Sequence, residues 1–209
     1  MTARIDSIVT SGTISLDGQT FDLDNNVWVL GDDEECVVVD APHDADAIAA
    51  LVGSRRLVAV LCTHAHVDHV NLAPKVGARL SAPVLLHPAD LPLWVLTHDT
   101  AAPDGELAAG QVLTVAGVDI TVLHTPGHTP GSVCFSVPAL GTVFTGDTLF
   151  EGGPGATSRS FSHFPTIIES IRTQLLVLPP ATRVLTGHGN ETTIGAEAPS
   201  LEAWVTRGH

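Results

Sequence analysis

The stretch LCTHAHVDHV, residues 61–70, places four metal-capable side chains within six positions. His64, His66, Asp68 and His69 directly follow an apolar, branched run, RLVAVLC, which predicts a buried strand. If these four ionisable groups were buried, each would need a polar partner to offset its lost hydration. Two interpretations are open at this point: a polar loop that is rich in histidine, or half of a metal site.

Three further stretches share this arrangement. His128 lies in TPGHTPGS, Asp147 in TGDTLF and His188 in TGHGN. In each case a strand-like run ends, and a turn containing threonine or glycine presents one histidine or aspartate. Strand ends are rigid platforms, and glycine permits close backbone approach. We therefore expect side chains from four strand ends to converge at one edge of the sheets.

The combined set of candidate ligands is too large for one metal ion. Five imidazoles and two carboxylates exceed the four ligands of a tetrahedral zinc. Two ions about 3.5–4 Å apart, with a hydroxide between them, would use the whole set. The candidate ligands are His64, His66, Asp68, His69, His128, Asp147 and His188. The other six histidines are interpreted as structural or surface residues: His43, His87, His98, His124, His163 and His209.

The spacing suggests how the ligands divide between two ions. Alternate residues of a short extended turn point the same way, so His64 and His66 can share the first metal. Asp68 and His69 lie further along the chain and can reach the second metal. The set is completed by His128 for the first trio, His188 for the second, and Asp147 as a bridge.

The composition fits a single domain, residues 1–209, with a large core, because 44% of the residues are hydrophobic and 15% are charged. No run of about 18 apolar residues occurs, and the N-terminus lacks the apolar segment of a signal peptide. Cys36, Cys62 and Cys134 lie in apolar, β-like runs. We interpret them as buried free thiols in a reducing cytoplasm.

The charge argues against a nucleic-acid partner. The chain has 23 acidic and 9 basic residues, a net charge of −14, and its basic residues form no cluster. An enzyme that acts on a polyanion needs a positive surface. A small-molecule substrate is the interpretation that remains.

The hydrophobic pattern predicts two halves of similar design, each a group of strands followed by strand–helix units. Near-continuous Val/Leu runs favour strands that are buried on both faces. We therefore predict an α/β fold with two sheets face to face and helices outside. Helices are expected over residues 44–53, 70–80, 88–97, 163–179 and 191–209.

These motifs resemble those of the metallo-β-lactamase fold hydrolases. The matching stretches are DNNVWVL, VVVDAP, THAHVDH, TPGHTPGS, FTGDTLF and TGHGNETT, between residues 24 and 194. The resemblance implies a four-layer αββα sandwich with the site at one sheet edge. It also implies that the two trios and the bridging Asp147 hold two zinc ions, although iron or manganese also suits such ligands. It assigns catalysis to Asp68 and His188, and a supporting role behind the ligands to Asp40.

GDTLF followed by a glycine-rich stretch is most similar to the glyoxalase II branch, the hydroxyacylglutathione hydrolases. In that branch the metal-bridging hydroxide attacks the carbonyl of a thioester of a small thiol, and a thiolate leaves. This chain has no tyrosine and ends about twenty residues after TGHGN, so we do not expect it to carry the glutathione-binding domain of that branch. The Ala-rich, Lys-poor composition favours an actinobacterial source, and hence a mycothiol-type conjugate as substrate. For substrate contacts we name Arg159 and His163 in the loop after Asp147.

Other reactions remain open on the same motifs. β-Lactamases that share the HxHxDH pattern generally lack the aspartate supplied here by Asp147, and acyl-homoserine lactonases usually use a tyrosine. A persulfide (sulfur) dioxygenase would bind one iron through two histidines and one aspartate, here matching His64 or His66 with His128 and Asp147. A non-enzymatic binding module is disfavoured, because all seven candidate ligands are present.

Overall fold

The apolar runs of the sequence form strands that are buried on both faces. In the computed structural model, which describes residues 2–16 and 19–208, strand β3 (Glu35–Val39) turns successive side chains towards two different cores. Cys36 and Val38 pack under helices, whereas Val37 and Val39 pack against the second sheet. Because neither face of the strand is exposed to water, its residues need not alternate between apolar and polar, and its sequence is a continuous apolar run.

The first sheet has the order β1-β2-β3-β4-β5-β6. Strands β1, β2 and β3 pair antiparallel, and β3 to β6 pair parallel. Strand β2 runs unbroken through the polar residues Asp24 and Asn25, because both continue the pairing with β1. The remaining bounds are β1 (Arg4–Leu16), β2 (Gln19–Gly31), β4 (Arg56–Leu61), β5 (Val84–Leu86) and β6 (Gly105–Glu106).

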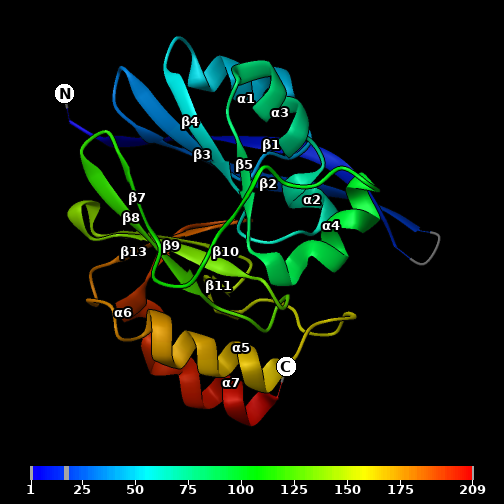
Figure 1. Ribbon diagram of the computed structural model, residues 1–209. Helices are drawn as coiled ribbons and strands as arrows, with labels where there is room; N and C mark the ends of the chain where they lie inside the picture. Colours follow the sequence, from blue (N-terminus) through cyan, green and yellow to red (C-terminus); the bar gives the residue numbers. More distant parts are fainter. Residues whose placement is uncertain (1, 17–18, 209) are drawn as a thin grey trace.

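The second sheet has the order β14-β13-β10-β9-β8-β7 and lies face to face with the first (Figure 1). All its pairs are antiparallel except β10 with β13. Its strands are β7 (Val112–Val115), β8 (Val118–His124), β9 (Val133–Val137), β10 (Thr142–Gly146), β13 (Arg183–Thr186) and β14 (Thr192–Thr193). A small separate hairpin joins β11 (Leu149–Phe150) and β12 (Gly153–Pro154).

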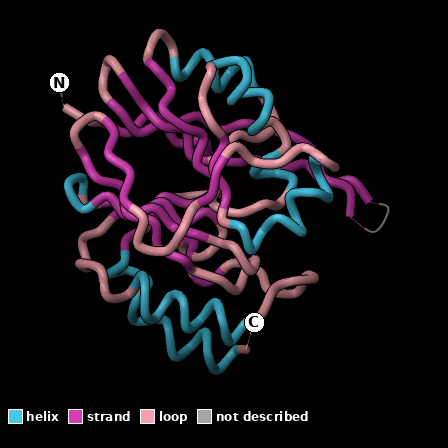
Figure 2. Tube along the Cα trace, viewed as in Figure 1, coloured by secondary structure: helices cyan, strands magenta, loops and turns pink. Residues whose placement is uncertain are grey.

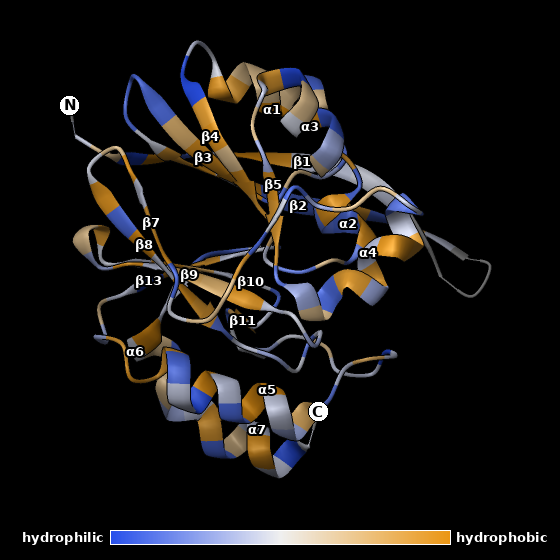
Figure 3. Ribbon diagram, in the orientation of Figure 1, coloured by the Kyte–Doolittle hydropathy of each residue, from blue (hydrophilic) through white to orange (hydrophobic). Residues whose placement is uncertain are grey.

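Helices cover the outer face of each sheet (Figure 2). The first sheet carries α1 (Ala45–Val52), α2 (Val67–Val70), α3 (Ala73–Leu80) and α4 (Leu91–His98). The second carries α5 (Phe164–Ser170), α6 (Ile194–Glu197) and α7 (Leu201–Arg207). Figure 3 shows apolar residues concentrated on the strands between these helical layers. The predicted αββα sandwich is confirmed.

Several predicted helices differ in their bounds. The helix expected over 191–209 is preceded by strand β14 and is divided into α6 and α7. The helix expected over residues 70–80 is divided into α2 and α3, and Pro74 occupies the first turn of the second helix. The helix expected over 163–179 ends as α5 at Ser170 and continues as a π-helical turn, Ile171–Leu175. Within residues 2–16 and 19–208, none of the helices has the length and apolar character needed to cross a bilayer.

Candidate metal centre

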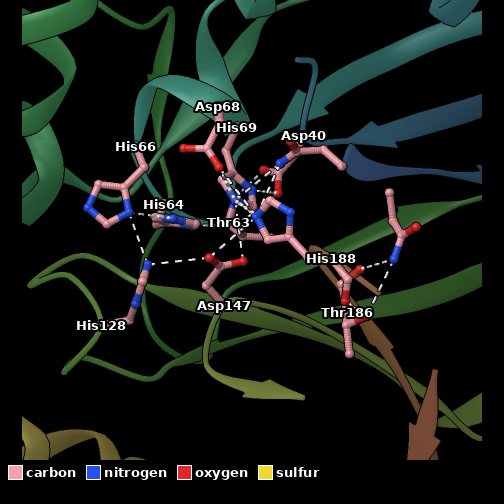
Figure 4. Close-up of polar contacts among 12 residues, drawn as sticks. Asp40, Thr63, His64, His66, Asp68, His69, His128, Asp147, Thr186 and His188 are labelled. Atoms are coloured by element: carbon pink, nitrogen blue, oxygen red, sulfur yellow. Dashed lines mark hydrogen bonds and ion pairs between the residues drawn. The ribbon is translucent and has the colours of Figure 1, made fainter. Parts of the chain in front are cut away.

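The ends of strands from both sheets meet at one edge of the sandwich. Strands β10 and β13 run parallel, so their ends coincide, and the Gly187 N–H donates to the Gly146 carbonyl at 2.9 Å. The Val133 N–H of the second sheet donates to the Thr63 carbonyl, just past β4 of the first, at 2.8 Å. These bonds bring the four histidine- and aspartate-bearing turns to one place (Figure 4).

The first trio consists of three imidazoles. Nδ1 of His66 lies 3.0 Å from Nε2 of His64 and 3.0 Å from Nε2 of His128. His64 and His128 are buried, and His66 is partly exposed. The structure therefore brings together the three histidines that the sequence assigns to the first metal.

The second trio consists of Asp68, His69 and His188. Nε2 of His188 lies 3.2 Å from Nε2 of His69 and 3.3 Å from Oδ2 of Asp68. Helix α2 begins at Val67, so Asp68 and His69 lie on a helical turn while His66 precedes it. Because the backbone changes from extended to helical after His66, His64 and His66 face the first candidate metal position, and Asp68 and His69 face the second.

Asp147 lies between the two trios. Its Oδ1 is 3.3 Å from Nε2 of His69, and its Oδ2 is 3.5 Å from Nε2 of His128 and 3.6 Å from Nε2 of His188. Oδ1 is buried, yet no described residue donates a hydrogen bond to it. A buried carboxylate oxygen without a donor is unfavourable. A cation at this position would satisfy it.

The outer nitrogens of four rings are held by hydrogen bonds. Nδ1 of His69 donates to Oδ2 of Asp40 at 2.8 Å, and Nδ1 of His64 donates to the Thr63 hydroxyl at 3.0 Å. Nδ1 of His128 donates to the Ala156 carbonyl and Nδ1 of His188 to the Asp24 carbonyl, at 2.8 and 2.7 Å. With Nδ1 protonated, the lone pair of each Nε2 points inward, as metal ligation requires.

Asp40 supports both trios from behind the ligands. It accepts the Thr63 N–H with Oδ1 at 2.8 Å and the Thr63 hydroxyl with Oδ2 at 2.8 Å, besides its bond from His69. The residue follows β3 and has a left-handed backbone, φ 58°. The supporting role that the family resemblance implies for Asp40 is compatible with these contacts and stays a prediction.

The electrostatics differ between the trios. Burial, reinforced by neighbouring histidines, lowers the pKa of His66 to about 3 and holds that of His64 well below its ordinary value. The pKa of His69 is raised despite its burial, because Asp147, Asp40 and Asp68 surround it. The first trio is therefore a set of neutral imidazoles at neutral pH. The second trio combines two imidazoles with the negative charge of Asp68.

The donor set fits metal ions. Nitrogen atoms that share a tetrahedral zinc at 2.0–2.1 Å lie about 3.3 Å apart, close to the separations of 3.0–3.2 Å between facing ring nitrogens here. In each trio the candidate ligand atoms lie within 4.8 Å of one another, as do those of His64, His69 and Asp147. Lone pairs that face one another without protons between them repel unless a cation lies among them.

Two polar residues at this centre were not predicted from the sequence. Asn25 on β2 turns its amide towards His69 and His188. Asp90 is fully buried and accepts hydrogen bonds from the Ala65 N–H, the Thr129 hydroxyl and the Gly131 N–H. Ala65 and Thr129 adjoin ligands of the first trio, so Asp90 ties their two loops together. Asn25 lies in DNNVWVL, but this stretch does not mark it as a residue of the centre. Asp90 lies in none of the motifs.

The two residues named for substrate contact lie on a loop beside the first trio. The loop is fixed at one end by the Ala156 carbonyl, which accepts from His128, and at the other by the His163 N–H, which donates to the Gly127 carbonyl. Arg159 is exposed between these anchors. The ring of His163 contacts Thr166 of its own helix at 2.8 Å. The structure places both residues near the centre but brings neither into the ligand set.

The fold and this arrangement of candidate ligands are typical of metal-dependent hydrolases. Residues 20–188 match the model of the metallo-beta-lactamase superfamily. The chain belongs to this superfamily.

Relatives and solved structures agree with this membership. The chain is 32% identical over 191 residues to the hydroxyacylglutathione hydrolase GloC of Haemophilus influenzae, covering 84% of this chain and 90% of the relative. It is similar to the crystal structure of the B3 metallo-beta-lactamase BLEG-1, with a TM-score of 0.75, 32% identity and coverage of 91% and 97%. It is also similar to TTHA1623 in a di-iron-bound form, with a TM-score of 0.72, 34% identity and coverage of 90% and 96%.

Proposed function

We propose that the protein hydrolyses thioesters of a small thiol with two metal ions. His64, His66 and His128 would hold one ion, Asp68, His69 and His188 the other, and Asp147 would contact both. The observation that carries this proposal is the position of Asp147, whose carboxylate oxygens lie 3.3–3.6 Å from ligand nitrogens of both trios. The di-iron form of TTHA1623 supports the count of two. The imidazole-rich set suits zinc, and it also suits iron or manganese.

The ions, when bound, would act as Lewis acids on a carbonyl oxygen and lower the pKa of a water between them. The protein's own contribution is orientation. Asp40, Thr63 and the Asp24 carbonyl hold the rings of His69, His64 and His188 with their lone pairs inward. Such preorganisation avoids the cost of reorienting dipoles as charge develops on the substrate.

A thioester suits this centre because its leaving group is a thiolate, which departs without a strong general acid. The likeness to GloC, named as a hydroxyacylglutathione hydrolase, supports the same reaction class. Glutathione is less well matched to the basic residues of this chain than a carrier with fewer anionic groups.

Six of the nine basic residues already pair with carboxylates: Arg4, Arg55, Arg56, Arg79, Arg172 and Arg183. The exposed Arg159 is the cation on the loop beside the centre, and it would pair one anionic group of another carrier, such as a mycothiol-type conjugate.

A panel of substrates tests this proposal. The metal-loaded protein is assayed on acyl thioesters of glutathione and of other small thiols, on a lactone and on β-lactams. We expect thioesters to be the best substrates and Asp147→Ala to abolish their turnover. Likeness to BLEG-1 makes β-lactam hydrolysis the second candidate, and preferential turnover of β-lactams would replace the first. One iron per chain with O₂ consumption on a persulfide would instead identify a dioxygenase.

A further inference from the structure

A buried amide from β2 faces the second trio. Asn25 is 1% exposed, and its Nδ2 lies 3.3 Å from Nε2 of His188 and 3.5 Å from Nε2 of His69. In the neutral rings, the form that binds a metal ion, both Nε2 atoms are acceptors, because the Nδ1 atoms donate to the Asp24 carbonyl and to Asp40. The amide therefore directs its N–H groups, and not its oxygen, towards the ligand atoms of the second trio.

His43 holds the amide in this orientation. Its Nε2 lies 2.8 Å from Oδ1 of Asn25, so the ring N–H donates to the amide oxygen. The ring is seated on Gly12 of β1, where an added Cβ would lie 2.1 Å from Nδ1 of His43. The backbone N–H of His43 also donates to Oδ1 of Asn71 at 3.1 Å. Together these contacts fix the backbone and the imidazole of His43, and through the imidazole the side chain of Asn25.

A metal ion at the second trio would take both lone pairs that Nδ2 now faces. The buried N–H groups would then need another acceptor, because a buried donor left unpaired is costly. A substrate carbonyl oxygen in front of His69 and His188 would supply such an acceptor during hydrolysis. Donors fixed in advance at such a position stabilise negative charge as it develops.

We propose that Asn25 is a catalytic residue that donates from Nδ2 to the carbonyl oxygen of the substrate, and that His43 is a positioning residue acting through Asn25. This inference rests on the proposed thioester hydrolysis. A water oxygen bonds to the carbonyl carbon, and the π electrons of the C=O bond move onto the oxygen that Asn25 contacts. When the C=O bond re-forms, the C–S bond breaks. The thiolate leaves with the electron pair, and the water's proton ends on the released thiol.

Two variants of Asn25 test the donor role. Asn25→Ala removes the amide, and Asn25→Asp keeps its size but removes the N–H groups. Each is measured for metal ions per chain by elemental analysis and for kcat and KM on the thioester that the wild type prefers. We expect both variants to retain the wild-type metal content and to lose about 10²–10³-fold in kcat, the loss seen when one oxyanion donor is removed. KM should change little.

Variants of His43 test whether it acts through the amide. His43→Ala should lower kcat less than Asn25→Ala does, with metal content unchanged, and His43→Gln should recover part of the loss because its amide N–H can donate. The double variant should be no slower than Asn25→Ala alone, because residues that act in series are not additive. Additive losses in the double variant would show that His43 does not work through Asn25.

Asn26→Ala is the matched control. The Asn26 amide donates to the carbonyls of Thr186 and Gly189, which flank His188, at 3.1 and 2.9 Å. This variant should lose metal together with activity. Loss of a metal ion in Asn25→Ala, or kcat equal to the wild type, would overturn the role of Asn25 while leaving the hydrolase intact. If the loaded wild type hydrolyses no thioester, the proposed function fails and the oxyanion role fails with it.

Discussion

Nδ1 of His69 lies 2.8 Å from Oδ2 of Asp40, a residue 29 positions earlier in the chain. The same carboxylate accepts the hydroxyl of Thr63, and that hydroxyl accepts from Nδ1 of His64 at 3.0 Å. One side chain thus orients a candidate ligand in each trio, directly in the second and through Thr63 in the first.

Asp40→Asn should weaken metal binding, because an amide cannot accept all three of the hydrogen bonds that the carboxylate accepts. We expect affinity to fall about 10–100-fold, as when the partner of a ligating histidine is lost. Competition with a chromophoric chelator measures this. Asp44→Ala is the control, since Asp44 caps α1 and should change stability by about 1 kcal/mol without changing metal affinity. Equal metal affinity in wild type and Asp40→Asn would contradict the role of Asp40.

The close approach of Gly146 to Thr63 should be essential to the centre. Gly146 has φ 49°, and an added Cβ would lie 2.5 Å from the Thr63 hydroxyl oxygen. Gly146→Ala should displace Thr63 and lower both metal content and activity. Gly141 has φ 56° at the other end of β10 and open space around it, so Gly141→Ala should cost only about 1 kcal/mol of left-handed strain. Elemental analysis and thermal unfolding separate the two, and equal metal content in both variants would contradict the steric account.

Asp90 should stabilise the fold by joining two loops. Asp90→Ala leaves the buried N–H groups of Ala65 and Gly131 unpaired, at about 1–3 kcal/mol each, and removes the acceptor of the Thr129 hydroxyl. We expect the free energy of unfolding to fall by about 3 kcal/mol or more in denaturant titrations. Asp90→Asn, which keeps one acceptor oxygen, should lose less. If the Ala and Asn variants are equally stable, the hydrogen bonds do not carry the effect.

The titration of Asp90 gives this residue a pH signature. Burial raises the pKa of Asp90 despite its three hydrogen bonds. The folded state therefore holds this proton more tightly than the unfolded chain, whose aspartates titrate near 3.9. The stability that this proton contributes is complete below about 3.9 and is lost as the pH rises through the folded pKa. The difference in stability between wild type and Asp90→Asn should shift across that window, whereas a constant difference would show that Asp90 does not titrate there.

The three cysteines should be unreactive in the folded protein. Cys36, Cys62 and Cys134 are free thiols and fully buried. Burial raises the pKa of Cys134 to about 11 and that of Cys62 well above its ordinary value. Because the thiolate is the reactive form, a disulfide reagent at pH 8 should modify none of them until denaturant is added. Rapid modification of one thiol in the native protein would show that its strand opens locally.

Much of the fold and of the candidate ligand set could be predicted from the sequence, because both depend on local patterns. Doubly buried strands appear as continuous apolar runs, and each ligand follows such a run in a short turn. The roles of Asn25 and Asp90 could not be predicted, since their partners lie 18 to 163 positions away, on other strands and loops. Some helix boundaries were also not predicted. One continuous helix was expected over 70–80, but α2 ends at Val70 and a new helix, α3, begins just before Pro74.

The loop that carries Arg159 should contribute to substrate choice. Its two ends are anchored beside His128 through Ala156 and His163, which explains why it lies at the centre. Arg159→Ala should raise KM for thioesters with anionic carriers and leave kcat within a few-fold of wild type, because the guanidinium would bind the carrier and not the reacting carbonyl. Steady-state kinetics on charged and uncharged thioesters checks this, and an equal effect on both would exclude charge recognition.

We propose that seven residues hold two metal ions that share Asp147. Metal content per chain, measured by elemental analysis after loading and gel filtration, tests it most directly. The wild type should hold two ions, and Asp147→Asn should hold fewer, because the shared carboxylate contacts both trios. One ion per chain in the wild type at saturating metal, or two ions in Asp147→Asn with unchanged affinity, would contradict it.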